Sequence, residues 1–324
     1  MFEKIRQSRS LLMGLAIFFI AFYHAPLEIH NFYIYVFSSS LNMGVDLFLF
    51  FSGLGACHSL AKRGAKSYLA QRAKRLLPGL YLFLLPWCGV MAYLGEMTLP
   101  EFLGNITFLG WWLGFHNQLN WYFSGVWLFF LLSPVLYKLF LKTKHTVCLW
   151  AVLVAFSFAI ALLCPNDYYM TVLTRLPIFI TGMLFGRLEQ TGFQKEHLLK
   201  IICWCLLPIG LYLVGLTYGG YGWEYGYSLG LWWYPYALVI PGGVLLVSEV
   251  AAWLRKRKVF RAAMRPMELL GESSSEGLMV HIGIYKIIFV LRTFHNHIWI
   301  MIWLTTMALS LLYRQITKRL PFSG

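Results

Sequence analysis

The sequence predicts an all-α protein, a single membrane bundle of about ten transmembrane helices with both termini in the cytoplasm. Of the 324 residues, 59% are hydrophobic and only 12% are charged, whereas about a quarter of a typical soluble domain is charged. Apolar runs recur along the whole chain, and the mean hydropathy is +0.64. Lysine and arginine gather between these runs. This pattern excludes a disordered chain, a coiled coil and a secreted disulfide scaffold.

The apolar runs define the predicted spans, because a helix needs about 20 mostly apolar residues to cross the hydrocarbon layer. The boundaries, set where charged or turn residues cluster, are 11–29, 41–60, 76–94, 121–140, 146–164, 170–187, 198–217, 229–250, 271–291 and 297–313. The apolar stretch 102–115 is too short to span. Its Trp111 and Trp112 suit the headgroup region, so we predict an interfacial or re-entrant segment on the outer side.

The distribution of basic residues predicts the orientation, because cytoplasmic loops retain lysine and arginine. With the N-terminus inside, all but three of the 27 basic residues lie on the cytoplasmic side, the exceptions being Arg175, Lys286 and Arg292. The net charge of +14 is therefore a sign of topology. Nucleic-acid binding is not expected, because the basic residues are spread over six short loops and form no basic domain.

The chain shows no internal repeat and no long linker, so residues 1–324 are predicted to form one membrane-embedded domain without an appended soluble one. The six cysteines lie mostly within spans and show no metal-ligand spacing beyond Cys203-x-Cys205. We therefore expect apolar packing roles for them and no metal site. The predicted location is the inner (plasma) membrane, where the chain would be a multi-pass protein and could form a homo-oligomer.

Ionisable side chains inside spans cost several kcal/mol and often mark a functional path. The candidates are His24 and Glu28 on the first span, Asp46 and His58 on the second, Arg175 on the sixth, and Glu272, Glu276, His281 and Lys286 on the ninth. At about 1.5 Å per residue, three of them, His24, Asp46 and Arg175, share one outer layer. They could form a proton-handling site. Alternatively, they pair only to neutralise one another.

Two further groups of residues are candidates. Arg72 and Arg75 lie three residues apart, so on a helix they share a face and could grip an anionic ligand at the inner surface; the alternative is an ordinary basic cytoplasmic loop. Glu276 and His281, five residues apart, lie about 140° apart around a helix. No contact between them is predicted.

Several segments resemble the signatures of acyltransferase family 3, polytopic membrane enzymes that O-acetylate cell-surface glycans and related lipid-linked sugars. Residues 44–53 (GVDLFLFFSG) are similar to its G-V-D-x-F-F-x-x-S-G signature, and 22–24 (FYH) to the end of its first helix. Other similar segments are 68–78 (R-x-x-R-x-x-P), the aromatic helix at 120–123, 175–186 (R-x-P-x-F-x-x-G-x-x-x-G), and 270–281. One departure is Met13, where the family has an arginine; Arg9 lies one turn earlier. The aromatic helix also lacks the glutamate that many members have.

The resemblance implies that an acetyl group, or another short acyl group, moves from cytoplasmic acyl-CoA to a hydroxyl of a cell-surface or lipid-linked saccharide in a bacterial envelope. Acetyl-CoA would be a co-substrate, and no cofactor would be bound permanently. His24 would be the general base or a transient acyl carrier, and Asp46 would orient it. The residues expected to bind donor or acceptor are Arg72, Arg75, Arg175, Arg9, Trp121, Tyr122, Glu276 and His281. Direct transfer is favoured over handing the acyl group to a partner protein.

A transporter or flippase for an envelope glycan precursor or another polar solute is the alternative function. Embedded charges and helices interrupted by proline and glycine, such as 206–208 and 240–243, are also typical of carriers. Carriers often contain repeats, and none is visible here. The two functions differ in donor dependence, because an acyltransferase consumes acetyl-CoA and a carrier does not.

Overall fold

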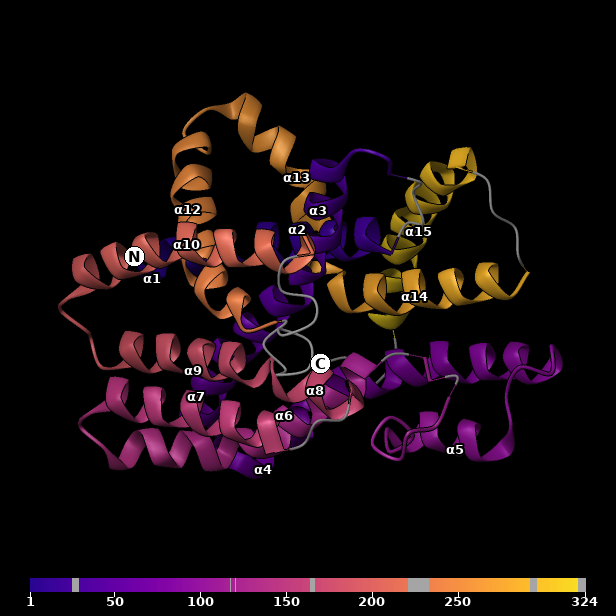
Figure 1. Cartoon of the computed structure of the whole chain (residues 1–324), viewed down its shortest axis with the longest axis horizontal. Helices are drawn as coiled ribbons and strands as arrows, with labels where there is room; N and C mark the ends of the chain where they lie inside the picture. The colour runs from indigo at the N-terminus through magenta and orange to yellow at the C-terminus, as the bar shows by residue number, and fades with distance from the viewer. Residues whose placement is uncertain are drawn as a thin grey trace.

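The computed structural model describes residues 1–24, 29–116, 118–119, 121–163, 167–220, 233–291 and 296–319, and within these ranges every regular element is a helix (Figure 1). The predicted all-α class is confirmed for this part of the chain. Glu28, named above as an embedded charge, and Arg292, named above as one of the three basic residues outside the cytoplasmic side, lie outside the described residues.

The first part of the chain forms a short helix and then three longer ones. Their bounds are α1 Phe2–Gln7, α2 Arg9–Tyr23, α3 Phe32–Ser40 and α4 Gly44–Tyr93, with the 3₁₀ turn η1 Leu41–Met43 before α4. At Gly64 (φ 71°, ψ 173°) α4 breaks into two helical segments. Glycine suits this position because side chains with a Cβ avoid positive φ. After the break, the helix that carries Arg72 and Arg75 continues directly into the predicted third span.

The middle of the chain contains α5 Leu99–Thr107, α6 Trp121–Lys142, α7 Thr146–Leu163, α8 Asp167–Leu173 and α9 Leu176–Gln190. The short α5 overlaps the first part of the stretch 102–115 that we predicted to be too short to span. Thr98 and Glu101 start it with a capping box, a reciprocal pair of hydrogen bonds that satisfies free backbone N–H groups.

The last part contains α10 Glu196–Tyr218, α12 Pro235–Leu254, α13 Lys258–Glu272, α14 Ser274–Leu291 and α15 Asn296–Thr317. We expected the basic run around residues 255–265 to be a loop. Much of it belongs to the amphipathic helix α13, which packs against α2. The sequence did not predict this helix because α13 is stabilised by packing its apolar side against a helix that is remote in the sequence.

Five helical stretches in the described residues are long and apolar enough to cross a membrane: Phe32–Tyr93, which includes the break at Gly64, Trp121–Lys142, Tyr169–Gln190, Glu196–Tyr218 and Pro235–Leu254. Shorter apolar helices cover Arg9–Tyr23 and Thr146–Ile160. These helices support a multi-pass membrane protein. The count of about ten spans and the cytoplasmic position of both termini stay predictions.

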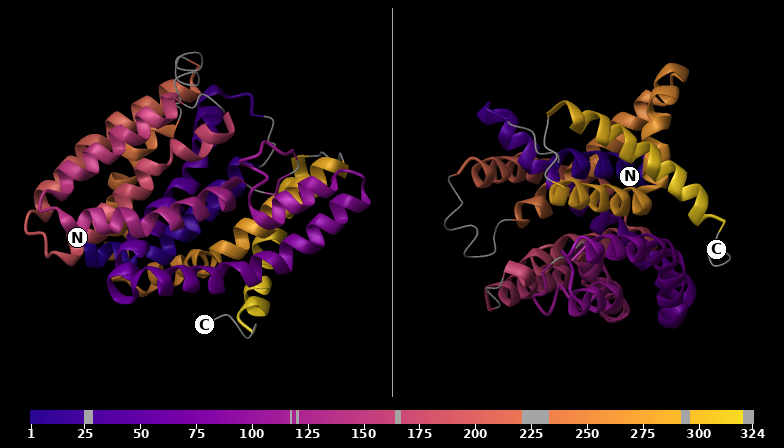
Figure 2. Two further views of the ribbon diagram at one scale, coloured as in Figure 1. Left: turned by 90° about the horizontal axis from the view of Figure 1, so that it is seen from below. Right: turned by 90° about the vertical axis from the view of Figure 1, so that its right-hand side faces the viewer.

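The helices form two groups (Figures 1 and 2). One group contains α5 to α9 with the second segment of α4, and the other contains α2, α3, α10 and α12 to α15. The first segment of α4 touches both. A Cβ on its Gly44 would come within 2.4 Å of the Ala16 carbonyl of α2, and one on Gly53 within 2.0 Å of the Phe179 carbonyl of α9. Small residues thus allow the backbones to approach closely, as membrane helices require.

The N-terminal helix α1 is held at one end of the bundle by ion pairs. The amino group of Met1 lies 2.7 Å from Glu196 Oε2, and Lys4 pairs with Glu249, which also accepts from Lys200 at 2.8 Å. Beside them, His58 Nε2 lies 2.9 Å from Glu189. The starts of α1 and α10 and the ends of α9 and α12 therefore meet at the end of the molecule that carries most of the basic residues.

Candidate functional site

A cavity of about 650 Å³ opens at this basic end, and a smaller chamber of about 210 Å³ adjoins it, because the two share lining residues from α2, α4, α13, α14 and α15. Basic side chains outnumber acidic ones in the larger cavity. The basic residues are Arg9, Lys62, Arg63, Arg72, Lys74, Arg75, Arg314 and Lys318, and the acidic ones are Glu272 and Glu276. Such an excess of cations in a partly enclosed space attracts an anionic ligand.

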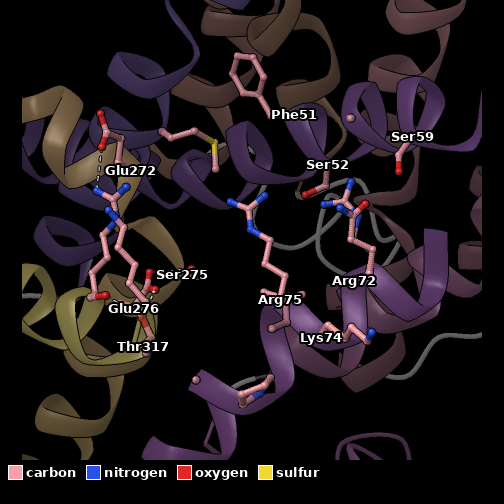
Figure 3. Close-up of a pocket in the computed structure, with 18 of the residues that line it drawn as sticks. Phe51, Ser52, Ser59, Arg72, Lys74, Arg75, Glu272, Ser275, Glu276 and Thr317 are labelled. Atoms are coloured by element: carbon pink, nitrogen blue, oxygen red, sulfur yellow. Dashed lines mark hydrogen bonds and ion pairs between the residues drawn. The ribbon is translucent and has the colours of Figure 1, made fainter. Parts of the chain in front are cut away.

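Arg72 is held in position by aromatic rings. Its guanidinium carbon lies 5.3 Å from the ring centre of Tyr68 and 4.9 Å from that of Phe130, distances typical of cation–π contacts. The Tyr68 hydroxyl is 3.2 Å from Ser133 Oγ, which fixes the ring. Arg72 and Arg75 extend from the same helical segment into the cavity (Figure 3). The predicted shared face of these two arginines is therefore present.

Arg9 and Met13 line both the cavity and the chamber. They are four residues apart on α2, so they project from one helical face. Arg9 therefore joins Arg72 and Arg75 around the same space. On this face Arg9 places a cation one turn closer to the basic end than position 13.

The opposite wall of the cavity carries its carboxylates (Figure 3). Glu272 lies 2.9 Å from Arg314 and 3.2 Å from Arg265. The hydrogen bonds and charge of these two arginines compensate the carboxylate of Glu272. Glu276 accepts hydrogen bonds from Ser275 Oγ (2.8 Å) and Thr317 Oγ1 (2.9 Å).

The smaller chamber leads from the arginines to an apolar end. Phe48, Tyr122, Phe123 and Leu278 line it together with Ser52. Leu278 precedes His281 by three residues, about one turn of α14. One lining residue of the chamber, Leu278, therefore lies about one helical turn from an embedded histidine.

His24 and His281 form a pair. His24 is the residue directly after α2 and is partly buried, whereas His281 on α14 is 6% exposed. His24 Nδ1 lies 2.9 Å from the Ile20 carbonyl and 3.3 Å from His281 Nε2. His281 Nδ1 lies 3.2 Å from the Gly277 carbonyl. The sequence indicated both histidines as candidates, but it did not predict that they touch.

Asp46 and Arg175 form a separate, buried ion pair. Asp46 is fully buried and Arg175 is 2% exposed. The Arg175 guanidinium lies between two indole rings, 5.3 Å from the centre of Trp121 and 5.2 Å from that of Trp233. Among the described side chains, the carboxylate that we expected to orient His24 is bonded to Arg175, and its orienting role stays a prediction. The alternative of mutual neutralisation describes this pair.

The predicted site residues thus fall into three clusters. Arg9, Arg72, Arg75, Tyr122 and Glu276 line the cavity or its chamber. His24 pairs with His281, and Arg175 lies with Asp46 and Trp121.

Sequence reasoning missed Glu272 and Arg314 as cavity residues. A signal was available for Arg314, which follows the last predicted span on the basic side. Nothing in the sequence indicated that α15 would stand beside α4. In the described residues, no group of three histidine, cysteine or acidic side chains could hold a metal ion.

The chain can now be compared with known proteins. No curated protein and no solved structure matches it. Residues 10–313 match the acyltransferase domain of family 3, a range that begins at the first turn of α2, ends near the end of α15 and includes every residue of the three clusters except Arg9. The chain therefore belongs to acyltransferase family 3 and is a membrane acyltransferase.

Proposed function

We propose that the protein transfers an acetyl group, or another short acyl group, from cytoplasmic acyl-CoA to a hydroxyl of a cell-surface or lipid-linked saccharide. The observation that carries this proposal is the basic cavity, whose arginines Arg9, Arg72 and Arg75 also line the smaller chamber together with apolar side chains such as Leu278. A CoA thioester has this same polarity, with phosphates at one end and an uncharged arm at the other.

The reaction replaces a carbon–sulfur bond by a carbon–oxygen bond and moves one proton in two transfers, first to His24 and then from it. His24 removes the proton from the acceptor hydroxyl while the hydroxyl oxygen attacks the thioester carbonyl carbon. The carbon–sulfur bond then breaks, and the thiolate leaves and takes the proton from His24. The products are the acyl ester and free CoA. In this proposal the donor occupies the basic cavity, and the acceptor approaches His24 from the opposite end of α2, roughly 22 Å from Arg9 at the rise of an α-helix.

The test is turnover of acetyl-CoA by the purified protein in liposomes that contain a lipid-linked saccharide. Release of the free CoA thiol and appearance of acetyl ester on the saccharide are measured together. Equal amounts of both products are expected. Uptake or efflux of the saccharide without consumption of acetyl-CoA would instead favour the carrier function.

Arg72→Ala is expected to raise the KM for acetyl-CoA about ten- to hundredfold and to change kcat little, because it removes a charge-assisted hydrogen-bond donor to phosphate. Steady-state kinetics checks this. Lys66→Ala is the matched control, since Lys66 is an exposed cation near the same break in α4 that does not line the cavity. A large fall in kcat at saturating donor would contradict the binding role.

Arg9→Ala is expected to raise the donor KM in the same way, since Arg9 faces the same space as Arg72. The double variant Arg9→Ala/Met13→Arg returns a cation to the same helical face one turn deeper and is expected to recover most of the affinity. The KM values of the two variants are compared with that of wild type. If the double variant binds the donor as weakly as Arg9→Ala, the cation at this face is not interchangeable.

A further inference from the structure

We propose that His281 is a positioning residue for His24, and that it performs the task which the sequence suggested for Asp46. By accepting the Nδ1 proton of His24, His281 leaves the lone pair of His24 on Nε2, the nitrogen that then takes the proton of the acceptor hydroxyl. This inference rests on the proposed acyl transfer and adds a residue to its mechanism.

The hydrogen bonds to backbone carbonyls decide where the protons are. A carbonyl oxygen can only accept, so an imidazole nitrogen bonded to one must carry a proton. His281 Nδ1 faces the Gly277 carbonyl at 3.2 Å and His24 Nδ1 faces the Ile20 carbonyl at 2.9 Å. Both rings are therefore protonated on Nδ1 when neutral. The Nε2 of each ring is then the unprotonated, accepting nitrogen.

As a result, His24 donates the hydrogen bond between the two rings and His281 accepts it. His281 Nε2, which carries a lone pair, lies 3.3 Å from His24 Nδ1, which carries the proton. That proton points between two acceptors, the Ile20 carbonyl and His281 Nε2. The His24 ring is thereby prevented from turning over, and its other nitrogen is kept basic. In many enzymes a carboxylate accepts this hydrogen bond from the N–H of the catalytic imidazole.

The same contact favours the protonated state that His24 reaches during the reaction. When Nε2 takes the hydroxyl proton, the ring becomes a cation with its positive charge shared by both N–H groups, and hydrogen bonds to a charged group are stronger than neutral ones. Among the described residues, Tyr23 and Tyr285 are also ring neighbours of His24, with centroids at 5.0 and 5.8 Å. The nitrogen of His281 lies at hydrogen-bond distance from His24 Nδ1, so His281 is placed to support the cation.

Packing keeps the His281 ring where this role requires it. The ring is almost fully buried, and the helix that carries it approaches α2 closely one turn earlier, where a Cβ on Gly277 would lie 3.4 Å from the Ile17 side chain. Leu278 and Met279 beside it are buried as well. Rotation of the imidazole away from His24 would therefore disturb a packed layer.

The test compares two substitutions of similar size, His281→Gln and His281→Met. Glutamine retains an accepting oxygen near the place of Nε2, whereas methionine has only a weakly accepting sulfur. We expect His281→Met to lower kcat about ten- to hundredfold with the donor KM within about twofold of wild type, and His281→Gln to keep kcat within about fivefold. Both are assayed by CoA release and ester formation in liposomes.

The outcomes separate this inference from the proposed function. Turnover that needs His24 but is unchanged in His281→Met would overturn the role of His281 and leave acyl transfer standing. Equal losses in the glutamine and methionine variants would show that His281 only fills space. A raised donor KM with unchanged kcat would assign His281 to donor binding. Absence of turnover in the wild type, with the donor bound or not, would overturn both ideas.

Discussion

His24→Ala is expected to lower acetyl-CoA turnover by a factor on the order of 10² to 10⁴, the usual contribution of a general base. The change removes the imidazole whose Nε2 is left free to accept a proton while Nδ1 is bonded to Ile20 and His281. The basic cavity is not lined by His24, so the affinity for acetyl-CoA should remain within about twofold of wild type, measured by equilibrium binding.

The control for this variant is His145→Ala. His145 is an exposed histidine in the connection between α6 and α7 that lines neither space, and its removal is expected to leave turnover unchanged. Mass spectrometry after rapid quenching separates the two roles open to His24, because an acyl carrier accumulates acylated protein and a general base does not. Full activity of His24→Ala with correct membrane insertion would remove His24 from the mechanism altogether.

Arg175→Met is expected to lower the free energy of unfolding by about 3–5 kcal/mol, the cost of leaving one charge of a buried pair uncompensated. In this variant the uncompensated charge is the carboxylate of Asp46, which is fully buried and has Arg175 as its ion-pair partner. The loss is measured by unfolding of the purified protein in detergent with denaturant. This loss of unfolding free energy arises within the protein itself, so it is expected both with and without substrate.

The double variant Asp46→Leu/Arg175→Met completes the comparison. Removing both charges leaves apolar groups of similar volume, and such replacements are often neutral or stabilising. We therefore expect the double variant to recover most of the stability that Arg175→Met loses. If the losses of the single variants Asp46→Leu and Arg175→Met simply add in the double variant, the pair is not coupled, and the ion pair does not stabilise the fold.

The sequence correctly predicted that Arg72 and Arg75 share a helical face, because this relation is local. Arg72 and Arg75 belong to one helix, and three-residue spacing alone puts them on one face. Their shared cavity also needed Arg9, Glu272 and Arg314 from other helices. Of these, the sequence had named Arg9 through its position one turn before Met13, again a local relation.

The pairing of the embedded polar groups could not be predicted in this way. Depth along a helix follows from residue count, so His24, Asp46 and Arg175 were assigned to one layer. Depth does not tell which way a side chain faces or which helix stands beside it. His281 is 257 positions from His24 in the chain, and it reaches His24 because α14 packs against α2 at Gly277.

The sequence by itself determined the all-helical membrane class, the clustering of the basic residues and the short list of embedded ionisable side chains. The reason is that the bilayer acts on each segment separately, through its apolar length and its flanking charges. The tertiary structure alone decided that Asp46 bonds Arg175 and that His24 meets His281. Those contacts depend on how whole helices rotate and approach, which close packing at residues such as Gly44 and Gly53 controls.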